Sequence, residues 1–144
     1  EKGYRAFGRE LTPDYNPVEA GLTFACKLKT DIDFLGRSAV EKAREVGPRR
    51  RLVSFVVDDP LPMLWGGELL LRDGDAVGLV TSAAWGETVG ACVGLGYVAE
   101  PGAPTTTPGR VREGSYTVNV AGDVYPVSIG LRAPYDPEGA KIRP

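Results

Sequence analysis

The sequence predicts an α+β fold rich in β-structure, in which a short α/β segment (residues 1–50) precedes a small antiparallel barrel or sandwich (residues 51–144). Helix signals are confined to the first 50 residues. After Arg51, strand signals recur at short intervals with turn dipeptides between them. The first segment is too poor in apolar residues to form a core alone, so we expect it to pack on the barrel or on another part of the protein.

Three stretches of the first segment carry structural signals. In NPVEAGL (16–22), the first and fourth residues are spaced as a capping box and predict a helical turn. Residues 23–29 alternate between apolar and polar side chains and predict a half-buried strand. Ser38 and Glu41 are spaced as a second capping box and predict a helix over 38–46, which a Gly-Pro pair ends.

The remaining residues read as short strands. The expected strands are 51–57, a pair within 67–85 folded about Asp73-Gly74, 91–98, and a pair within 114–129 that turns near Ala121-Gly122-Asp123. Residues 99–109 predict a rigid, proline-rich loop, and no further helix is expected. Five or six short strands must hide their edges, which favours a barrel or a sandwich.

Composition and charge narrow the function. The chain has 144 residues, a formal net charge of -2 and a sequence pI of about 5.2, so we expect no general affinity for nucleic acid or for an acidic membrane. The one basic run, 49–51, is short and is interpreted as a solvated approach to a strand. No stretch reaches the length of a membrane span. Cys26 and Cys92 have no CxxC spacing, and we expect buried free thiols and a cytoplasmic location.

Histidine is absent from the chain, and this excludes several kinds of chemistry. Ser-His-Asp or Cys-His catalysis and histidine-containing metal sites cannot be built from these residues alone. The carboxylates fall in expected turns, loops and helix starts, where capping and solvation are their default roles. We therefore name no catalytic residue and no metal ligand.

Four ordered motifs resemble a known family. GYRAFGREL, NPVEAGL, DFLGRSAV and VGLVTSAAWGETVGACVGLGYV follow one another as in the C-terminal part of the aminomethyltransferase (glycine-cleavage T-protein) family. The sequence is similar in particular to the folate-binding portion fused to flavin-dependent dimethylglycine and sarcosine dehydrogenases, including the YDPEGAKIR stretch at 135–143.

The resemblance implies a fold, a cofactor and a reaction. Residues 1–50 would end the central folate-binding domain, and residues 51–144 would form the C-terminal β-barrel. Members pass a one-carbon unit to tetrahydrofolate as 5,10-methylenetetrahydrofolate, and FAD would belong to an upstream domain that this sequence does not contain. The implied partners are folate and the upstream flavin and transferase domains. The family's catalytic aspartate also lies upstream, so we expect no turnover by these 144 residues alone.

The resemblance also implies candidate folate-binding residues. Glu1 matches a glutamate that grips the pterin ring in the family, where a carboxylate can accept two parallel N–H donors. A frayed terminal acid is the alternative. Tyr4 would line the same cleft, or pack as an ordinary tyrosine.

Three further positions follow from the later motifs. Lys27 and Lys29 would face the glutamate tail of folate, or simply form a polar strand face. Trp85 would pack beside the ligand, or within the barrel. The DF-x-G motif that ends at Gly36 is interpreted as structural, as a glycine turn that leads into the helix.

Two other functions remain open at this level. The chain could be a non-catalytic interaction module, a β-barrel that docks through exposed Trp65 and Trp85. Folate-dependent iron-sulfur assembly relatives carry a signature similar to the residues at 2–9, but its cysteine and glutamine are missing here.

Overall fold

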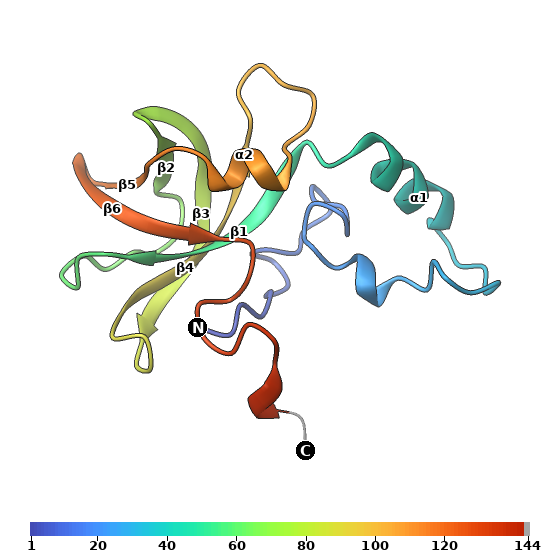
Figure 1. Cartoon of the computed structure of the whole chain (residues 1–144), viewed down its shortest axis with the longest axis horizontal. Helices are drawn as coiled ribbons and strands as arrows, with labels where there is room; N and C mark the ends of the chain where they lie inside the picture. The colour runs from blue at the N-terminus through green and yellow to red at the C-terminus, as the bar shows by residue number, and fades with distance from the viewer. Residues whose placement is uncertain (143–144) are drawn as a thin grey trace.

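The computed structural model describes residues 1–142 and contains a closed six-stranded barrel (Figure 1). Its strands are β1 (Arg50–Val57), β2 (Leu69–Arg72), β3 (Asp75–Gly86), β4 (Ala91–Ala99), β5 (Tyr116–Val120) and β6 (Asp123–Gly130). They pair antiparallel in the order β1-β4-β3-β2-β5-β6, and β6 pairs back onto β1. Of the two predicted architectures, the barrel is therefore confirmed.

The two predicted hairpin turns form where the sequence placed them. Asp73 and Gly74 both have positive φ, 53° and 93°, and join β2 to β3. Ala121 and Gly122, with φ of 54° and 103°, join β5 to β6 in the same way. Successive positive φ values suit the right-handed twist of the flanking strands.

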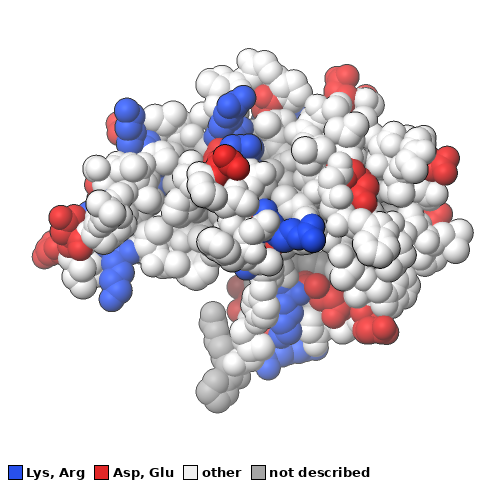
Figure 2. Space-filling model, turned by 180° about the vertical axis from the view of Figure 1, so that it is seen from behind, with Lys and Arg blue, Asp and Glu red and all other residues white. Residues whose placement is uncertain are grey.

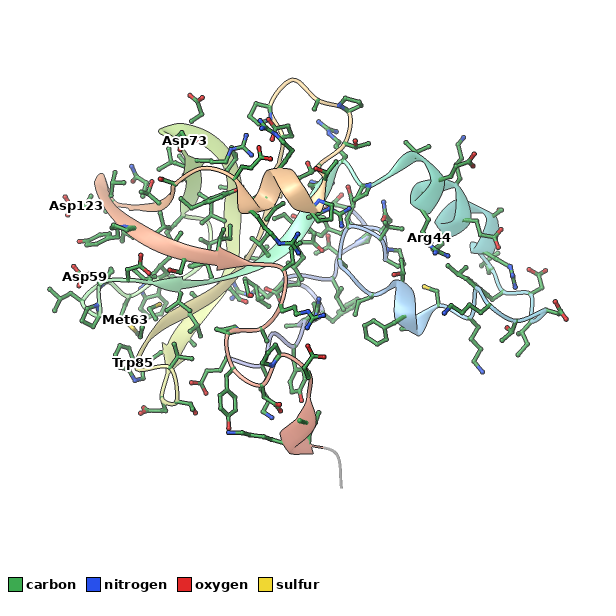
Figure 3. The ribbon with its side chains drawn as sticks, viewed as in Figure 1. Arg44, Asp59, Met63, Asp73, Trp85 and Asp123 are labelled. Carbon is green, nitrogen blue, oxygen red and sulfur yellow. The ribbon has the colours of Figure 1, made fainter. Side chains whose placement is uncertain are left out.

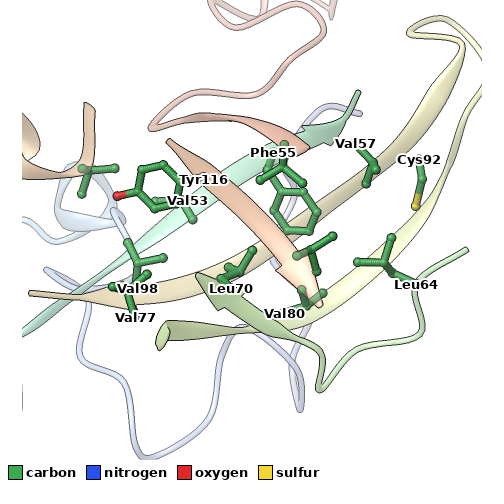
Figure 4. Packing of buried hydrophobic residues seen from close by; sticks show 13 residues of the cluster. Val53, Phe55, Val57, Leu64, Leu70, Val77, Val80, Cys92, Val98 and Tyr116 are labelled. Atoms are coloured by element: carbon green, nitrogen blue, oxygen red, sulfur yellow. The ribbon is translucent and has the colours of Figure 1, made fainter. Parts of the chain in front are cut away.

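The barrel interior is filled by apolar side chains from all six strands (Figure 4). Phe55 lies opposite Gly94 on the neighbouring strand, where a Cβ would come within 2.2 Å of the phenyl ring. Glycine at this position therefore gives the ring its space. The buried cluster comprises Val53, Phe55, Val57, Leu64, Leu70, Val77, Val80, Cys92, Val98, Val111, Tyr116, Val118 and Val127.

Residues of the N-terminal segment cover part of the outer surface of the barrel. Leu52 and Tyr97 point outward from β1 and β4 and are nevertheless buried. The Leu52 N–H donates to the Glu19 carbonyl at 2.9 Å, and the Tyr97 hydroxyl donates to the Glu10 carbonyl at 2.9 Å. The expectation that the first segment packs on the barrel holds for residues 1–22.

Residues 23–46 form an arm that extends away from the barrel (Figure 1). It holds a 3-10 turn, η1 (Thr23–Ala25), and the helix α1 (Arg37–Val46). The predicted strand at 23–29 is wrong. No neighbouring strand pairs with it within the described residues, and its Phe24 side chain is 82% exposed. A strand needs a partner for its backbone groups, and hydrogen bonds within the turn satisfy them instead.

The predicted helix at 38–46 is confirmed, but its capping box is wrong. The helix begins one residue earlier, after Gly36, which has φ of 88° and no side-chain cap. Ser38 therefore lies inside the first turn, and Glu41 pairs with Arg37 at 2.9 Å. The interpretation of Gly36 as a glycine turn into the helix is confirmed.

The capping box of the 16–22 segment does form. Asn16 Oδ1 accepts from the Val18 and Glu19 N–H groups at 2.9 and 3.0 Å, while the Asn16 N–H donates to the Glu19 carboxylate at 3.3 Å. The segment makes hydrogen-bonded turns rather than a regular helix.

Two helical elements after Arg51 contradict the expectation of none. α2 (Pro108–Arg112) ends the proline-rich loop, where the Thr107 hydroxyl accepts from the Arg110 N–H at 3.3 Å and Pro108 occupies the first helical position. η2 (Ala140–Ile142) is a short 3-10 turn. The Thr-Pro pair at 107–108 is the helix-start signal that the sequence reading missed.

Two further expectations are corrected in part. Both cysteines are free, as expected, but only Cys92 is buried, while Cys26 on the arm is half-buried. In the basic run, only Arg49 is an exposed residue that precedes the strand, as predicted. Arg50 and Arg51 begin β1, and Arg51 Nε donates to the Thr106 carbonyl at 2.6 Å. Desolvation lowers the pKa of Arg51.

Charges of both signs are interspersed over the face shown in Figure 2, and no extended patch of one sign covers it. Among residues 1–142, no helix has the length and apolar character needed to cross a membrane.

Candidate functional site

A cavity of about 310 Å³ lies between the N-terminal residues and the outer surface of the barrel. Strands β1, β3 and β4 form its floor, residues 1–4 form one wall, and Pro134 closes another side. Its lining residues are Glu1, Lys2, Gly3, Tyr4, Ser54, Ser82, Ala83, Ala84, Val93, Gly94, Leu95 and Pro134. The floor is mostly apolar, and two serine hydroxyls interrupt it.

Glu1 is anchored on the hairpin that joins β3 to β4. Its Oε1 accepts from the Thr88 and Val89 N–H groups at 2.6 and 2.9 Å, so the residue is not frayed. The hydrogen bond from Val89 is the largest effect on the pKa of the Glu1 carboxyl and, together with the hydrogen bonds from Thr88, lowers it against the opposing effect of desolvation. Gly86 permits this approach, since a Cβ there would lie 3.0 Å from Glu1 Cγ.

Residues near the end of the described chain hold the N-terminal wall in place. Lys2 Nζ pairs with the Asp136 carboxylate at 3.2 Å, and the Tyr135 N–H donates to the Glu1 carbonyl at 3.3 Å. The Ser54 hydroxyl, on β1, donates to the Arg132 carbonyl. Segments more than 130 residues apart in the sequence thus meet at the cavity.

Below the cavity, a fully buried carboxylate joins the N-terminal segment to β3. Glu10 is 0% exposed, and its Oε1 accepts from the Thr81 and Ser82 hydroxyls at 2.6 Å each. Its Oε2 accepts from the Ala6 N–H at 2.8 Å. Burial raises the pKa of Glu10, but the hydrogen bonds from Ser82, Thr81 and Ala6 together outweigh it, and the pKa is lowered.

An irregularity in β3 explains how two successive hydroxyls reach one oxygen. Val80 pairs with Gly96 and Ser82 with Leu95, so Thr81 is an extra residue opposite β4. Successive side chains of a regular strand point to opposite faces. A β-bulge breaks this alternation and redirects side chains, and here Thr81 and Ser82 both face Glu10.

An aromatic stack holds the same segment farther along the strand. The rings of Tyr15 and Tyr97 lie 3.8 Å apart between centroids with an interplanar angle of 9°. The Arg50 guanidinium lies over the Tyr15 ring, 4.5 Å from its centroid, and its Nε is 3.5 Å from the Glu19 carboxylate. Burial is the main cause of the raised pKa of Tyr97.

The structure brings together two of the five predicted site residues. Glu1 and Tyr4 both line the cavity, and Tyr4 remains 68% exposed. Lys27 and Lys29 are exposed on the arm that leads to α1, away from the cavity. Trp85 is 40% exposed and does not line the cavity; Figure 3 shows it near the end of the β3–β4 hairpin, on the opposite side of the molecule from Arg44 of α1.

Sequence reasoning missed three residues of this region. Ser54 and Ser82 lie in strands that read as apolar, and Glu10 lies within the GYRAFGREL motif, where no role was predicted for it. The one available signal was the polar pair Thr81-Ser82 inside an otherwise apolar strand, which predicts a local irregularity or a buried polar partner.

The closed barrel and the segments packed on it were compared with known proteins, and the comparison identifies the class of domain. Residues 50–136 match the model of the glycine cleavage T-protein C-terminal barrel domain, and the chain belongs to this family. It is 41% identical over 143 residues to a mitochondrial sarcosine dehydrogenase of Mus musculus, and 39% identical over 93 residues to an aminomethyltransferase of Symbiobacterium thermophilum.

These alignments differ in how much of each protein they cover. They include 99% and 64% of this chain, respectively, but only 16% and 24% of the two relatives. The glycine cleavage system aminomethyltransferase T of Bartonella henselae has the same fold, with a TM-score of 0.73 at 24% identity, over 89% of this chain and 34% of that one. The chain therefore corresponds to a small part of its longer relatives.

Proposed function

We propose that this chain is the C-terminal tetrahydrofolate-binding part of a one-carbon transferase, and that the cavity beside Glu1 receives the pterin ring. The observation that carries the proposal is the position of Glu1. Its Oε1 is fixed by two backbone N–H groups, so the carboxylate is held at the cavity wall in one orientation. Oε2 then accepts an N–H of the pterin, and the apolar floor packs against the ring.

The relatives support a proposal for the reaction of the whole protein. A sarcosine dehydrogenase and an aminomethyltransferase are both similar to this chain. We propose that the full protein oxidises an N-methyl amine at a flavin in an upstream domain and delivers the methylene unit to tetrahydrofolate as 5,10-methylenetetrahydrofolate. Residues 1–50 would then end the central transferase domain. We expect no turnover from residues 1–144 alone.

The three remaining candidates keep a proposed role outside the cavity. Lys27 and Lys29 would attract the carboxylates of a polyglutamate tail that extends beyond the pterin. Replacing both with glutamine should weaken binding of a polyglutamylated folate more than binding of the monoglutamate. Trp85 follows the cavity-lining Ala84 in β3 and would report ligand binding through its fluorescence.

Titration calorimetry with tetrahydrofolate under reducing conditions tests the main proposal. The Glu1→Ala variant should weaken binding at least tenfold, because it removes a charged acceptor. Glu87→Ala is the matched control, since it removes an exposed carboxylate from the same hairpin without touching the cavity lining. Equal affinities of the two variants would contradict the role of Glu1.

One observation favours a different function, the docking barrel. Trp65 is 81% exposed in the loop between β1 and β2, and Met63 beside it is also exposed. If the wild-type chain and a version extended upstream both fail to bind tetrahydrofolate, the interaction module becomes the better assignment. A cytoplasmic location stays a prediction, and the mouse relative is described as mitochondrial.

A further inference from the structure

We propose that Glu10 is a positioning residue that makes Ser82 a hydrogen-bond acceptor in the cavity, directed at an N–H group of the bound tetrahydrofolate. This inference rests on the proposed function and deepens it. It assigns a role in ligand recognition to a buried carboxylate that does not itself reach the cavity lining.

The hydrogen bonds of the cluster determine the polarity of Ser82. A hydroxyl has one proton and two acceptor lone pairs. An ionised carboxylate only accepts, so the Ser82 proton is committed to Glu10 Oε1 at 2.6 Å. The lone pairs of the Ser82 oxygen remain able to accept a hydrogen bond, and Ser82 lines the cavity. Reduced pterins carry several N–H donors that fit such a group.

Thr81, at the bulge, serves as a control for Ser82, because both hydroxyls bind the same Glu10 oxygen. The Thr81 hydroxyl lies 2.6 Å from the same Oε1 and 3.1 Å from the Leu95 carbonyl, but Thr81 does not line the cavity. If Glu10 only clamps the N-terminal segment to β3, the two hydroxyls are equivalent. If it positions a ligand-binding group, only Ser82 affects affinity.

Glutamine at position 10 should invert the polarity of Ser82. The Ala6 N–H lies 2.8 Å from Oε2 and needs an acceptor, so the amide oxygen of Glu10→Gln takes that place. The amide NH₂ then faces the two hydroxyls. Ser82 accepts from it, and the Ser82 proton is released toward the cavity, where it opposes an N–H donor of the ligand.

The test compares Ser82→Ala, Glu10→Gln, their double variant and Thr81→Val by tetrahydrofolate calorimetry, with thermal unfolding of each measured in parallel. We expect Ser82→Ala and Glu10→Gln each to weaken binding about fivefold to tenfold, the value of one hydrogen bond. Thr81→Val should stay within twofold of wild type. In the Ser82→Ala background, Glu10→Gln should change the affinity no further.

Each outcome decides the question. If wild type binds and Ser82→Ala binds within twofold of Thr81→Val, the positioning role is wrong while the proposed function stands. Equal weakening by all three single variants, in step with their loss of thermal stability, assigns Glu10 a purely structural role. If Glu10→Gln does not fold, the comparison of Ser82→Ala with Thr81→Val still gives the answer. Absence of binding by both the wild-type chain and a version extended upstream overturns the proposed function itself.

Discussion

The ring of Tyr15 lies flat against the ring of Tyr97, with centroids 3.8 Å apart, and thereby joins the N-terminal segment to the outer surface of β4. Aromatic pairs contribute about 0.5–1.5 kcal/mol beyond the area that they bury. The Arg50 guanidinium also lies over the Tyr15 ring, 4.5 Å from its centroid. The stack is therefore a main attachment of the segment that carries the cavity wall.

Replacement of Tyr15 tests this attachment. We expect Tyr15→Ala to lower the free energy of unfolding by about 2 kcal/mol, since a half-buried aromatic side chain and its stack are lost. Tyr15→Phe keeps the ring and should change the free energy of unfolding by less than about 0.5 kcal/mol. Urea denaturation measures both, and similar losses in the two variants would argue against the stack.

An added methyl group at Gly86 should affect the ligand site more than the barrel. The Cβ of Gly86→Ala would lie 3.0 Å from Glu1 Cγ and 3.1 Å from Glu1 Oε1, and would push the carboxylate from its anchor. We expect tetrahydrofolate affinity to fall severalfold, measured by calorimetry. Gly109→Ala, where the nearest atom is 3.8 Å away, is the control and should leave affinity unchanged.

Substitutions inside the barrel, at Gly94 and at Phe55, should partly compensate for one another. The Cβ of Gly94→Ala would lie 2.2 Å from Phe55 Cζ, so the ring must move. We expect a loss of about 3 kcal/mol in the free energy of unfolding. The double variant Gly94→Ala, Phe55→Leu should lose less than the sum of the single losses, because the smaller side chain vacates the same space. Additive losses would show that the two positions are independent.

A cluster of ion pairs at one side of the barrel predicts a pH dependence. Arg72 Nη2 donates to Glu100 Oε1 at 3.0 Å, and Arg110 Nη2 to the same oxygen at 2.9 Å. The hydrogen bonds from Arg72 and then Arg110 lower the pKa of Glu100 to about 2, from an ordinary value of 4.5. Because the folded-state pKa is the lower one, the stabilisation is complete above pH 4.5 and is lost as the pH falls toward about 2.

The difference in thermal midpoint between wild type and Glu100→Gln measures this effect. It should be constant from pH 7 to about pH 5 and should shrink below pH 4.5. Glu113→Gln is the matched control, since Glu113 pairs only with Arg110 among the described residues and is exposed. A difference for Glu100→Gln that does not depend on pH would contradict the assigned pairing.

The barrel could be predicted because its signals are local. Alternating apolar residues and the Asp73-Gly74 and Ala121-Gly122 turns specify strands and hairpins without reference to the rest of the chain. The expected strand at 23–29 failed for the opposite reason. Its alternation was present, but a strand forms only where a neighbour pairs with it, and no strand within the described residues does so.

The candidate site was only partly predictable. Glu1 and Tyr4 were named through the family resemblance, and both line the cavity. The contacts of Glu10 depend on a one-residue bulge and on hydroxyls more than 70 positions away in the sequence. No pattern within the first segment encodes either feature. Lys27 and Lys29 matched a motif, but the motif does not specify where the arm points.

The closed strand order has a consequence for how the molecule assembles. β1 acquires its second neighbour only when β6, the last strand of the sequence, pairs with it. Residues 132–136 can then contact Ser54, Glu1 and Lys2 and complete the wall around the cavity. Contacts between distant residues form late, because closing long loops is slow. On a ribosome, a nascent chain that has not yet exposed residue 136 would carry most of a barrel and no finished cavity. Synthesis must therefore pass residue 136 before the wall around this cavity can be complete.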